Sequence, residues 1–395
     1  MKMKNIIKKQ QKTIFISFLS VVLFLICICT VCTAYAADKD NAKTPVDIPG
    51  LTYDHSMELS YAKEFSVDYY KDGYALITID QEGQFLVVPE GKKAPEGLDK
   101  DITVIQQPLN NIYLVATSAM DLFRAIDGID NIRLSGTQEN GWYIQEAKDA
   151  MESGKMIYAG KYNAPDYELI LNEGCGLAIE STMIHHNPEV EEKLEQFGIP
   201  VMVERSSYES HPLGRTEWMK LYAVLLGKED VAEKAFKEQT DKLDKVLTSD
   251  DKDTGKTVAF FYINSTGAVN VRKNGDYVSN MIELAGGSYV LDDAQTASTS
   301  GSSVTLEMER FFATAKDADI IVYNGTIDES VATLNDFVGK NALLSQFKAV
   351  KNGNVWVTSA DMYQQMTSTA DIIDELHGAF TGDDASAFHY LRKLG

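Results

Sequence analysis

The chain has 395 residues, of which 44% are hydrophobic and 24% charged, with a net charge of −21 at pH 7. This composition is ordinary for a globular protein, and the acidic balance argues against nucleic acid or anionic lipid as a partner. The length exceeds what a single hydrophobic core usually supports, so two domains are expected.

Residues 1–36 are predicted to be a signal peptide. Five lysines open the chain, residues 13–31 carry no charge, and the small-residue sequence Ala34-Tyr35-Ala36 follows. This order is typical of a cleaved export signal, with Ala37 as the first mature residue. Removal of the leader lysines from the 37 basic residues leaves 32 against 58 acidic residues, a net charge of about −26.

Two other fates of this leader remain open. Residues 13–31 are long enough to stay in the bilayer as an anchor. Cys27, Cys29 and Cys32 are candidates for lipidation, although each follows Ile or Val where a small residue is expected. In every case the rest of the chain is expected outside the cytoplasmic membrane, in a periplasm or on the extracellular face. Cys175 is the one cysteine beyond the leader, so no intrachain disulfide is expected there.

After a polar tether at residues 37–60, the pattern of apolar residues alternates with a period of two. This pattern predicts strands at 65–69, 74–79 and 85–87, which turn at Lys71-Asp72-Gly73 and Glu82-Gly83.

Short apolar runs then alternate with stretches of helical spacing, which predicts an α/β fold with a mainly parallel sheet. The expected strands are 112–116, 132–134, 177–179 and 201–203, and the expected helices are 120–126, 143–151, 166–172 and 188–197.

A long charged helix is predicted to join two such halves. Trp218, Leu221, Tyr222 and Leu225 form the apolar stripe of one helix, which Gly227 interrupts. The strand and helix alternation starts again after a loop at 249–255. The expected domains are an N-terminal lobe at 61–227, a connecting helix at 228–248 and a C-terminal lobe at 249–395, each lobe Rossmann-like, with a ligand cleft between them.

Motifs for enzymatic chemistry are missing from the sequence. It has no phosphate-loop pattern, no Gly-x-Ser-x-Gly elbow and no His-Glu-x-x-His pair. His185, His186 and His211 cluster around one strand-helix-strand unit, but a metal-ion site needs three or four convergent ligands. We therefore expect no resident metal, cofactor or catalytic residue.

Aromatic, histidine and arginine side chains follow several predicted strands, where open α/β sheets place their ligands. Such residues suit a large, flat or anionic ligand, although each ring could equally pack in a core. The candidate ligand-binding residues are Trp142, Tyr143, His185, Tyr208, His211, Arg272, Tyr277 and Tyr363, with Met362 beside the last.

The stretch from Glu209 to Trp218, Glu-Ser-His-Pro-Leu-Gly-Arg-Thr-Glu-Trp, and its continuation to Glu229 resemble a signature of one class of ABC-importer substrate-binding proteins. That class carries iron-siderophore complexes, haem or cobalamin. Residues 280–287, 308–312 and 316–324 agree with it, and the similarity covers most of residues 60–380.

This resemblance implies a periplasmic-binding-protein-like fold, in which one long helix spans two α/β lobes and the ligand lies between them. The helix at 228–247 would be that connector. The family pairs one glutamate of each lobe with arginines of the membrane permease. By motif position these are Glu168 and Glu309, with Glu307 as an alternative to the second.

The function predicted from the sequence is capture of an iron chelate (siderophore or haem) or a corrinoid, and delivery to an ABC importer permease. The partners are thus the permease and a small metal chelate, and the chain is expected to act as a monomer. Two alternatives are a binding protein for a bare zinc or manganese ion and a secreted metal-dependent hydrolase.

Overall fold

The computed structural model describes residues 45–248, 253–292 and 301–395. The predicted signal peptide and the first part of the tether lie outside these residues. Residues 47–395 form one compact unit, distinct from residues 1–46. Within the described ranges, no helix is both long enough and apolar enough to cross a bilayer.

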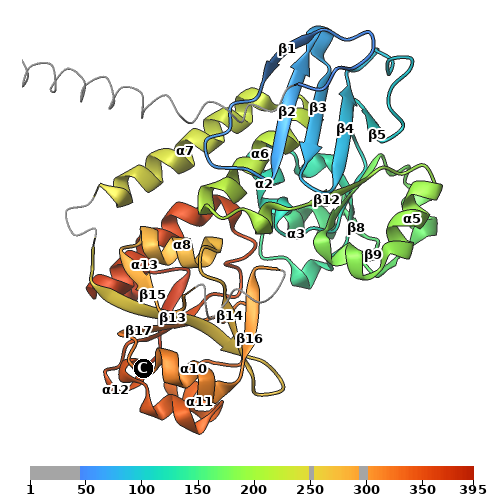
Figure 1. The fold of residues 1–395 in the computed structure, drawn as a ribbon. Helices are drawn as coiled ribbons and strands as arrows, with labels where there is room; N and C mark the ends of the chain where they lie inside the picture. The colour runs from blue at the N-terminus through green and yellow to red at the C-terminus, as the bar shows by residue number, and fades with distance from the viewer. Residues whose placement is uncertain (1–44, 249–252, 293–300) are drawn as a thin grey trace, which may run out of the picture. The chain divides into compact units, whose positions relative to one another are not determined.

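A five-stranded sheet, here the N-terminal sheet, precedes the two lobes (Figure 1). Its strands follow one another in chain order and are antiparallel, except that β5 runs parallel to β4. The predicted strands in this region are confirmed, but they form a sheet of their own instead of joining the parallel sheet that follows. The bounds are β1 Tyr53–Ser56, β2 Phe65–Tyr70, β3 Ala75–Ile79, β4 Gly83–Val88 and β5 Ile102–Gln106.

The N-lobe, residues 107–227, is built on a five-stranded sheet of order β12-β11-β6-β7-β8. All of its pairings are parallel, as predicted, so the loops that follow the strands gather at one edge. The strands are β6 Ile112–Leu114, β7 Ile132–Ser135, β8 Ile157–Tyr158, β11 Leu177–Ser181 and β12 Val201–Glu204, and a small hairpin joins β9 Gly160–Lys161 to β10 Ala164–Pro165. The helices are α2 Ala119–Ala125, α3 Gln145–Glu152, α4 Tyr167–Asn172 and α5 Pro188–Gln196.

Two helices lead from the N-lobe towards the second half of the chain. Helix α6, Pro212–Leu226, is buried along almost its whole length and ends where Gly227 takes up a left-handed conformation, with φ of 65°. Helix α7, Glu229–Leu247, buries only one stripe of side chains. It packs against α6 and against α13 (Thr369–Thr381) of the second lobe, and its bounds agree closely with the predicted connector.

The C-lobe, residues 253–395, contains a seven-stranded sheet of order β16-β14-β13-β17-β18-β19, with β15 also paired to β13. Its centre is parallel and its edge strands are antiparallel, so the sheet is mixed where a mainly parallel one was predicted. The strands are β13 Lys256–Ile263, β14 Val269–Arg272, β15 Gly287–Tyr289, β16 Ser303–Leu306, β17 Ile320–Tyr323, β18 Val355–Thr358 and β19 Leu391–Lys393. The remaining helices are α8 Tyr277–Leu284, α10 Met308–Ala315, α11 Leu334–Gly339 and α12 Lys348–Lys351.

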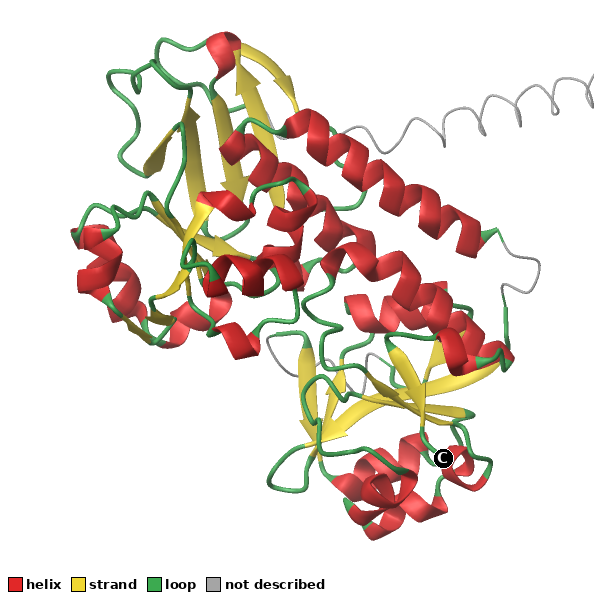
Figure 2. Ribbon diagram, turned by 180° about the vertical axis from the view of Figure 1, so that it is seen from behind, coloured by secondary structure: helices red, strands yellow, loops and turns green. Residues whose placement is uncertain are grey.

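The main hydrophobic core runs through both lobes, and a smaller one lies on the other face of the N-lobe sheet. Figure 2 shows a group of helices between the strands of the N-terminal half and the C-lobe sheet. Among them, α6 contacts α2, α7, α8 and α13, so the lobes meet along packed helices as well as along loops.

Candidate functional site: the contact between the lobes

Loops from the two lobes meet through a pair of amide contacts. The side chain of Gln364, which follows β18, accepts a hydrogen bond from the backbone N–H of Tyr143 at 2.9 Å and donates one to the carbonyl of Gly141 at 2.8 Å. The hydroxyl of Tyr143 also lies 3.2 Å from a carboxylate oxygen of Glu329, in the loop after β17. We call these contacts the amide latch, because they join the loop after β7 to two C-lobe loops.

A second group of contacts lies behind the latch. Asp121 of α2 is fully buried, and it accepts hydrogen bonds from the backbone N–H and the hydroxyl of Thr367 at 2.7 and 2.8 Å. Arg124 pairs with Asp121 at 2.7 Å and donates to the same threonine hydroxyl at 2.8 Å. A buried carboxylate with this many partners fixes the position of the two lobes relative to each other.

An arginine and tyrosine cluster fills the space between α6 and α8. The guanidinium carbon of Arg215 lies 3.7 Å from the ring centroid of Tyr277, and that of Arg272 lies 4.9 Å from it. Arg272 also forms two short hydrogen bonds to Asp276, at 2.8 and 2.6 Å. Burial lowers the pKa of Arg272, but Tyr277 and Asp276 outweigh burial and raise it, so this guanidinium stays charged.

Several buried polar atoms of the two lobes have no hydrogen-bond partner among the residues that the structure describes. They include Nε of Arg215, Oγ of Ser206 and Oδ1 of Asn324, all buried. Arg215 is only 7% exposed, and its side chain forms no ion pair or hydrogen bond within the described part of the chain. A buried polar group without a partner is costly, so these atoms mark a place where water or ligand atoms are expected.

Besides Asp276, which pairs with Arg272, Glu204 is an acidic group close enough to Arg215 for their charges to interact. It accepts a hydrogen bond from the backbone N–H of Ser206 at 2.9 Å and one from the hydroxyl of Ser118 at 3.2 Å. Burial raises the pKa of Glu204, and its hydrogen bonds and the charge of Arg215 offset only part of that effect.

The cavity between the lobes is small in this structure, about 10 Å³, which is room for a single water molecule. Entry of a larger ligand therefore requires the lobes to separate. The cavity is lined by Pro212, Arg215, Tyr277, Met281, Met362, Tyr363, Gln365, Met366, Thr369 and Ile372.

Three of the residues predicted from the sequence lie together here. Arg272 and Tyr277 belong to the cluster, and Tyr363 lines the cavity while its hydroxyl accepts a hydrogen bond from Asn324 at 2.8 Å. Tyr143 lies at the latch, with its side chain 40% exposed.

The other predicted residues lie elsewhere. Trp142 is only 1% exposed and donates to Ser135 at 3.2 Å, so its ring packs in the N-lobe core and presents no face to the cavity. His185 is exposed, 3.2 Å from Glu82. Tyr208 stacks with Arg205 at 4.3 Å. His211 accepts a hydrogen bond from the backbone of Leu213 as the cap of α6, and burial lowers its pKa.

The histidines therefore do not converge. In the described ranges, no group of three or more His, Cys, Asp or Glu side chains could hold a metal ion. Sequence reasoning also missed Arg215, Asn324 and Gln364. Arg215 stands inside the Glu209–Trp218 stretch, but nothing in the pattern indicated that its side chain would lack a partner.

Two glutamates of the same stretch have a structural role. Glu217 is fully buried and accepts hydrogen bonds from the backbone N–H groups of residues 60–62, at 2.8 to 3.1 Å. Glu209 accepts from the backbone of residues 63 and 64 and from the indole of Trp218 at 3.0 Å. A side chain at Gly214 would meet Glu209 and the Tyr61 carbonyl at 3.2 Å. The stretch thus fixes the chain before β2 to α6.

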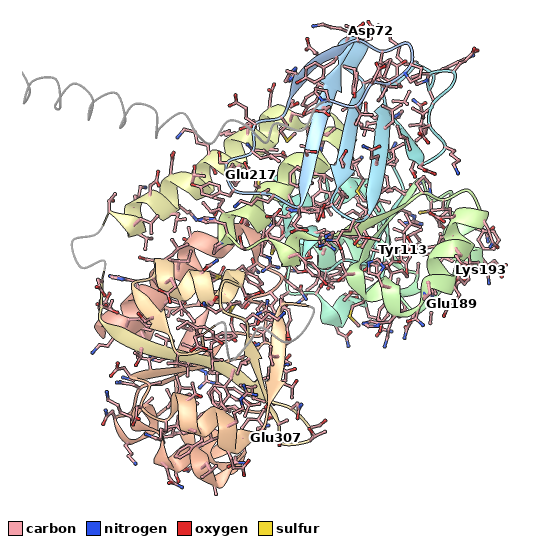
Figure 3. All side chains as sticks on the ribbon, in the orientation of Figure 1. Asp72, Tyr113, Glu189, Lys193, Glu217 and Glu307 are labelled. Carbon is pink, nitrogen blue, oxygen red and sulfur yellow. The ribbon has the colours of Figure 1, made fainter. Side chains whose placement is uncertain are left out.

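The predicted docking glutamates lie on outer helices, one in each lobe. Glu168 is exposed in the first turn of α4, and Glu309 is exposed in the first turn of α10. Glu307, the alternative to Glu309, is the cap of α10 and lies on the C-lobe (Figure 3). Their role remains a prediction.

Known proteins resemble this chain in sequence and in fold. Two relatives are uncharacterized lipoproteins of Methanocaldococcus jannaschii, one 27% identical over 86% of this chain and 84% of its own, the other 24% identical over 92% and 97%. A periplasmic haem-binding protein of Vibrio cholerae is 16% identical over 68% of this chain and 98% of its own, with a TM-score of 0.53. A protein of an ABC-type Fe3+-hydroxamate transport system from Saccharomonospora viridis is 18% identical over 69% and 93%, with a TM-score of 0.54.

At these identities the solved structures bear on the fold alone, and they agree with two α/β lobes. A family model described as periplasmic binding protein matches residues 115–362, which is well over half of the chain and includes most of both lobes. The chain therefore belongs to the periplasmic binding protein family.

Proposed function

We propose that this protein captures an iron chelate or a corrinoid between its lobes and delivers it to an ABC importer permease without making or breaking bonds. The observation that carries the proposal is the cluster of Arg215, Arg272 and Tyr277 where the lobes meet. Guanidinium groups pair with carboxylates in fork geometry and stack on rings. This chemistry suits a chelate that is both anionic and flat, such as a carboxylate-bearing ring system.

Nε of Arg215, which has no hydrogen-bond partner among the described residues, supports the same proposal, because a ligand carboxylate would accept a charged hydrogen bond from it. Since the cavity is small, the chelate enters when the amide latch opens and the α6–α8 contact loosens. Helix α7 packs against both lobes, so we expect a modest separation of the lobes instead of a wide hinge motion. An exported location on the outer face of the membrane belongs to this proposal, as do a released or membrane-tethered state and a monomeric form.

The test is a titration of purified residues 37–395 with haemin, ferric siderophores and corrinoids, followed by intrinsic tryptophan fluorescence. We expect saturable quenching by one chelate class, because Trp142 adjoins the latch residue Tyr143. Zinc and manganese ions serve as the comparison. If no chelate binds and a bare ion does, the proposal is wrong and the metal-ion alternative takes its place.

A further inference from the structure

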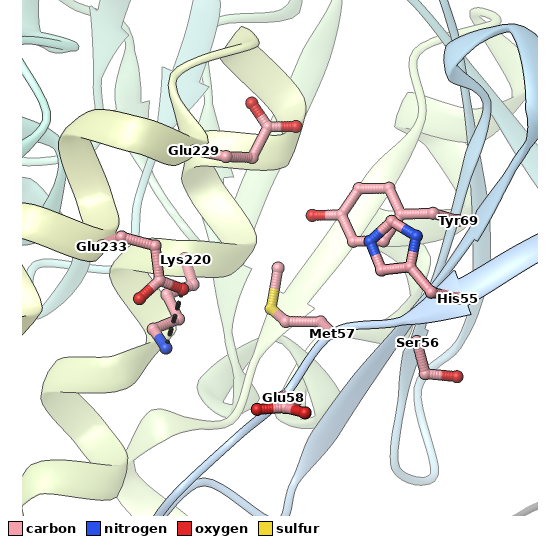
Figure 4. Close-up of a pocket in the computed structure, with 8 residues that line it drawn as sticks. All are labelled: His55, Ser56, Met57, Glu58, Tyr69, Lys220, Glu229 and Glu233. Atoms are coloured by element: carbon pink, nitrogen blue, oxygen red, sulfur yellow. Dashed lines mark ion pairs between the residues drawn. The ribbon is translucent and has the colours of Figure 1, made fainter.

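A pocket of about 490 Å³ lies between the N-terminal sheet and helices α6 and α7 (Figure 4). Its volume is within the range of small-molecule sites. Residues of the β1–β2 region form one side of it, and they lie outside residues 115–362, which the family model matches. The residues that line it are different from those that line the cavity between the lobes, so the two cavities are separate. The pocket is lined by His55, Ser56, Met57, Glu58, Tyr69, Lys220, Glu229 and Glu233.

One wall of the pocket is aromatic and apolar. The rings of His55 and Tyr69 stack with their centroids 4.6 Å apart and their planes 17° apart, and Met57 continues this surface. The Tyr69 hydroxyl points towards the side formed by α7 (Figure 4), and it has no hydrogen-bond partner among the residues that the structure describes. Aromatic faces of this kind attract organic cations.

The opposite wall is acidic. Glu229 and Glu233 lie on α7, and Glu58, from the segment between β1 and β2, adds a third carboxylate to the lining. The basic residue of the lining, Lys220, is already paired with Glu217 at 3.3 Å and with Glu233 at 3.0 Å. Glu229 forms no ion pair in the described part of the chain, and burial raises its pKa. A bound cation would offset the cost of this partly buried charge.

A metal ion does not account for these features, since no three or more His, Cys, Asp or Glu side chains among the described residues are placed so that they could hold one. A protein lysine inserted from outside would use the charge but leave much of the apolar wall uncovered. We propose that the pocket binds a small organic cation, an amine or quaternary ammonium compound whose apolar body lies on Tyr69 and whose charge faces Glu229.

The test is calorimetric titration of the full-length chain in a non-ionic detergent with choline, phenethylammonium and spermidine. The neutral isostere of choline, 3,3-dimethyl-1-butanol, is the ligand control. We expect saturable binding of at least one cation and none of the neutral alcohol. Glu229→Gln and Tyr69→Leu should each weaken that binding about tenfold, the effect of losing one charge pair or one cation–π contact.

Two matched variants separate binding from folding. Tyr69→Phe keeps the ring and should restore most of the binding that Tyr69→Leu loses, whereas Glu238→Gln changes an exposed glutamate of α7 outside the pocket and should bind as the unaltered chain does. The proposal is overturned if no cation binds, if the neutral alcohol binds as well as choline, or if Glu229→Gln leaves the affinity unchanged. Because the pocket and the interlobe cavity share no lining residue, chelate binding should be the same in all four variants.

Discussion

The guanidinium carbon of Arg215 in the N-lobe lies 3.7 Å from the ring centroid of Tyr277 in the C-lobe. This contact joins the lobes directly, yet Arg215 has no hydrogen-bonding partner of its own within the described residues, and its Nε is buried. The contact therefore packs the lobes against each other and leaves Nε of Arg215 without a hydrogen-bond partner among the described residues, at the place where the proposed function puts the ligand.

Arg215→Gln should weaken chelate binding about tenfold or more, because the neutral side chain cannot form a charged hydrogen bond to a ligand carboxylate. The affinity of Arg215→Lys should fall between that of the unaltered chain and that of Arg215→Gln, since an ammonium keeps the charge without the flat stacking surface. Fluorescence titration measures both. Arg310→Gln, at an exposed position on α10, is the control and should bind normally. Equal affinities for all three variants would remove Arg215 from the site.

Gln364→Ala should speed both the binding and the release of the chelate several-fold. The variant loses both hydrogen bonds of the amide latch, to Tyr143 N–H and to Gly141 carbonyl, so the lobes should separate more readily. Stopped-flow fluorescence gives the two rates. Gln346→Ala, at an exposed position of the C-lobe, should leave them unchanged. Unaltered rates in Gln364→Ala would mean that the latch does not limit access.

Glu168→Arg combined with Glu309→Arg should abolish uptake through the permease while leaving chelate affinity intact. Each change places a positive charge where a glutamate is proposed to pair with an arginine of the permease, and like charges across an interface are strongly unfavourable. Uptake by cells that express the importer and titration of the purified variant are measured together. Glu152→Arg combined with Glu238→Arg is the charge-matched control. Impaired uptake in Glu307→Arg but not in Glu309→Arg would transfer the C-lobe role to Glu307.

Glu180→Gln should stabilise the protein at pH 8.5 and have little effect at pH 5. Glu180 is fully buried in β11, and neither carboxylate oxygen has a hydrogen-bond partner in the described ranges; burial, and then Glu191, raise its pKa from 4.5 to about 8. Its neighbour Tyr113, marked in Figure 3, offers it no hydrogen bond, because its hydroxyl donates to Gly160.

The direction in which stability changes with pH follows from proton binding to Glu180. Between pH 4.5 and about 8 the folded protein holds a proton on Glu180 that the unfolded chain has lost, so the free energy of unfolding falls as the pH rises through this window. Gln is neutral at every pH, so the Glu180→Gln variant should lack this dependence of the free energy of unfolding on pH. Thermal melts at several pH values measure it, with exposed Glu152→Gln as the control. Parallel pH profiles for Glu180→Gln and the unaltered chain would show that Glu180 is not buried as described.

Glu217→Ala should lower the free energy of unfolding by about 3 kcal/mol or more, because backbone N–H groups of residues 60–62 lose their acceptor. Glu217→Gln keeps one acceptor oxygen and should cost less. Urea denaturation provides the values. Glu238→Ala, on the exposed side of α7, should change stability by no more than about 0.5 kcal/mol. A loss of that small size in Glu217→Ala would contradict the anchoring role.

The sequence predicted much of the fold because hydrophobic period and helix signals are local. The parallel order of the N-lobe, the helix over Trp218–Leu225 and the long helix after Gly227 all follow from such patterns. The separate N-terminal sheet and the antiparallel edges of the C-lobe sheet could not be predicted in this way, since strand partners are chosen by contacts far apart in sequence.

The candidate site was predicted only in part for the same reason. Arg272, Tyr277 and Tyr363 were found because they follow strands. Trp142 also follows a strand, but its ring is buried in the core. Arg215 belongs to the candidate site only because its side chain contacts Tyr277 of the other lobe, and the sequence pattern does not show such a contact.

Retention of a chelate during gel filtration tests directly whether the protein captures a metal chelate. Purified residues 37–395 are mixed with each chelate of the panel, and metal and protein are quantified in the eluted peak. We expect one chelate per chain for a single chelate class, and a loss of most of the bound chelate in the Arg215→Gln variant. Elution of the protein without any chelate, or with zinc or manganese ions bound in its place, would contradict the account.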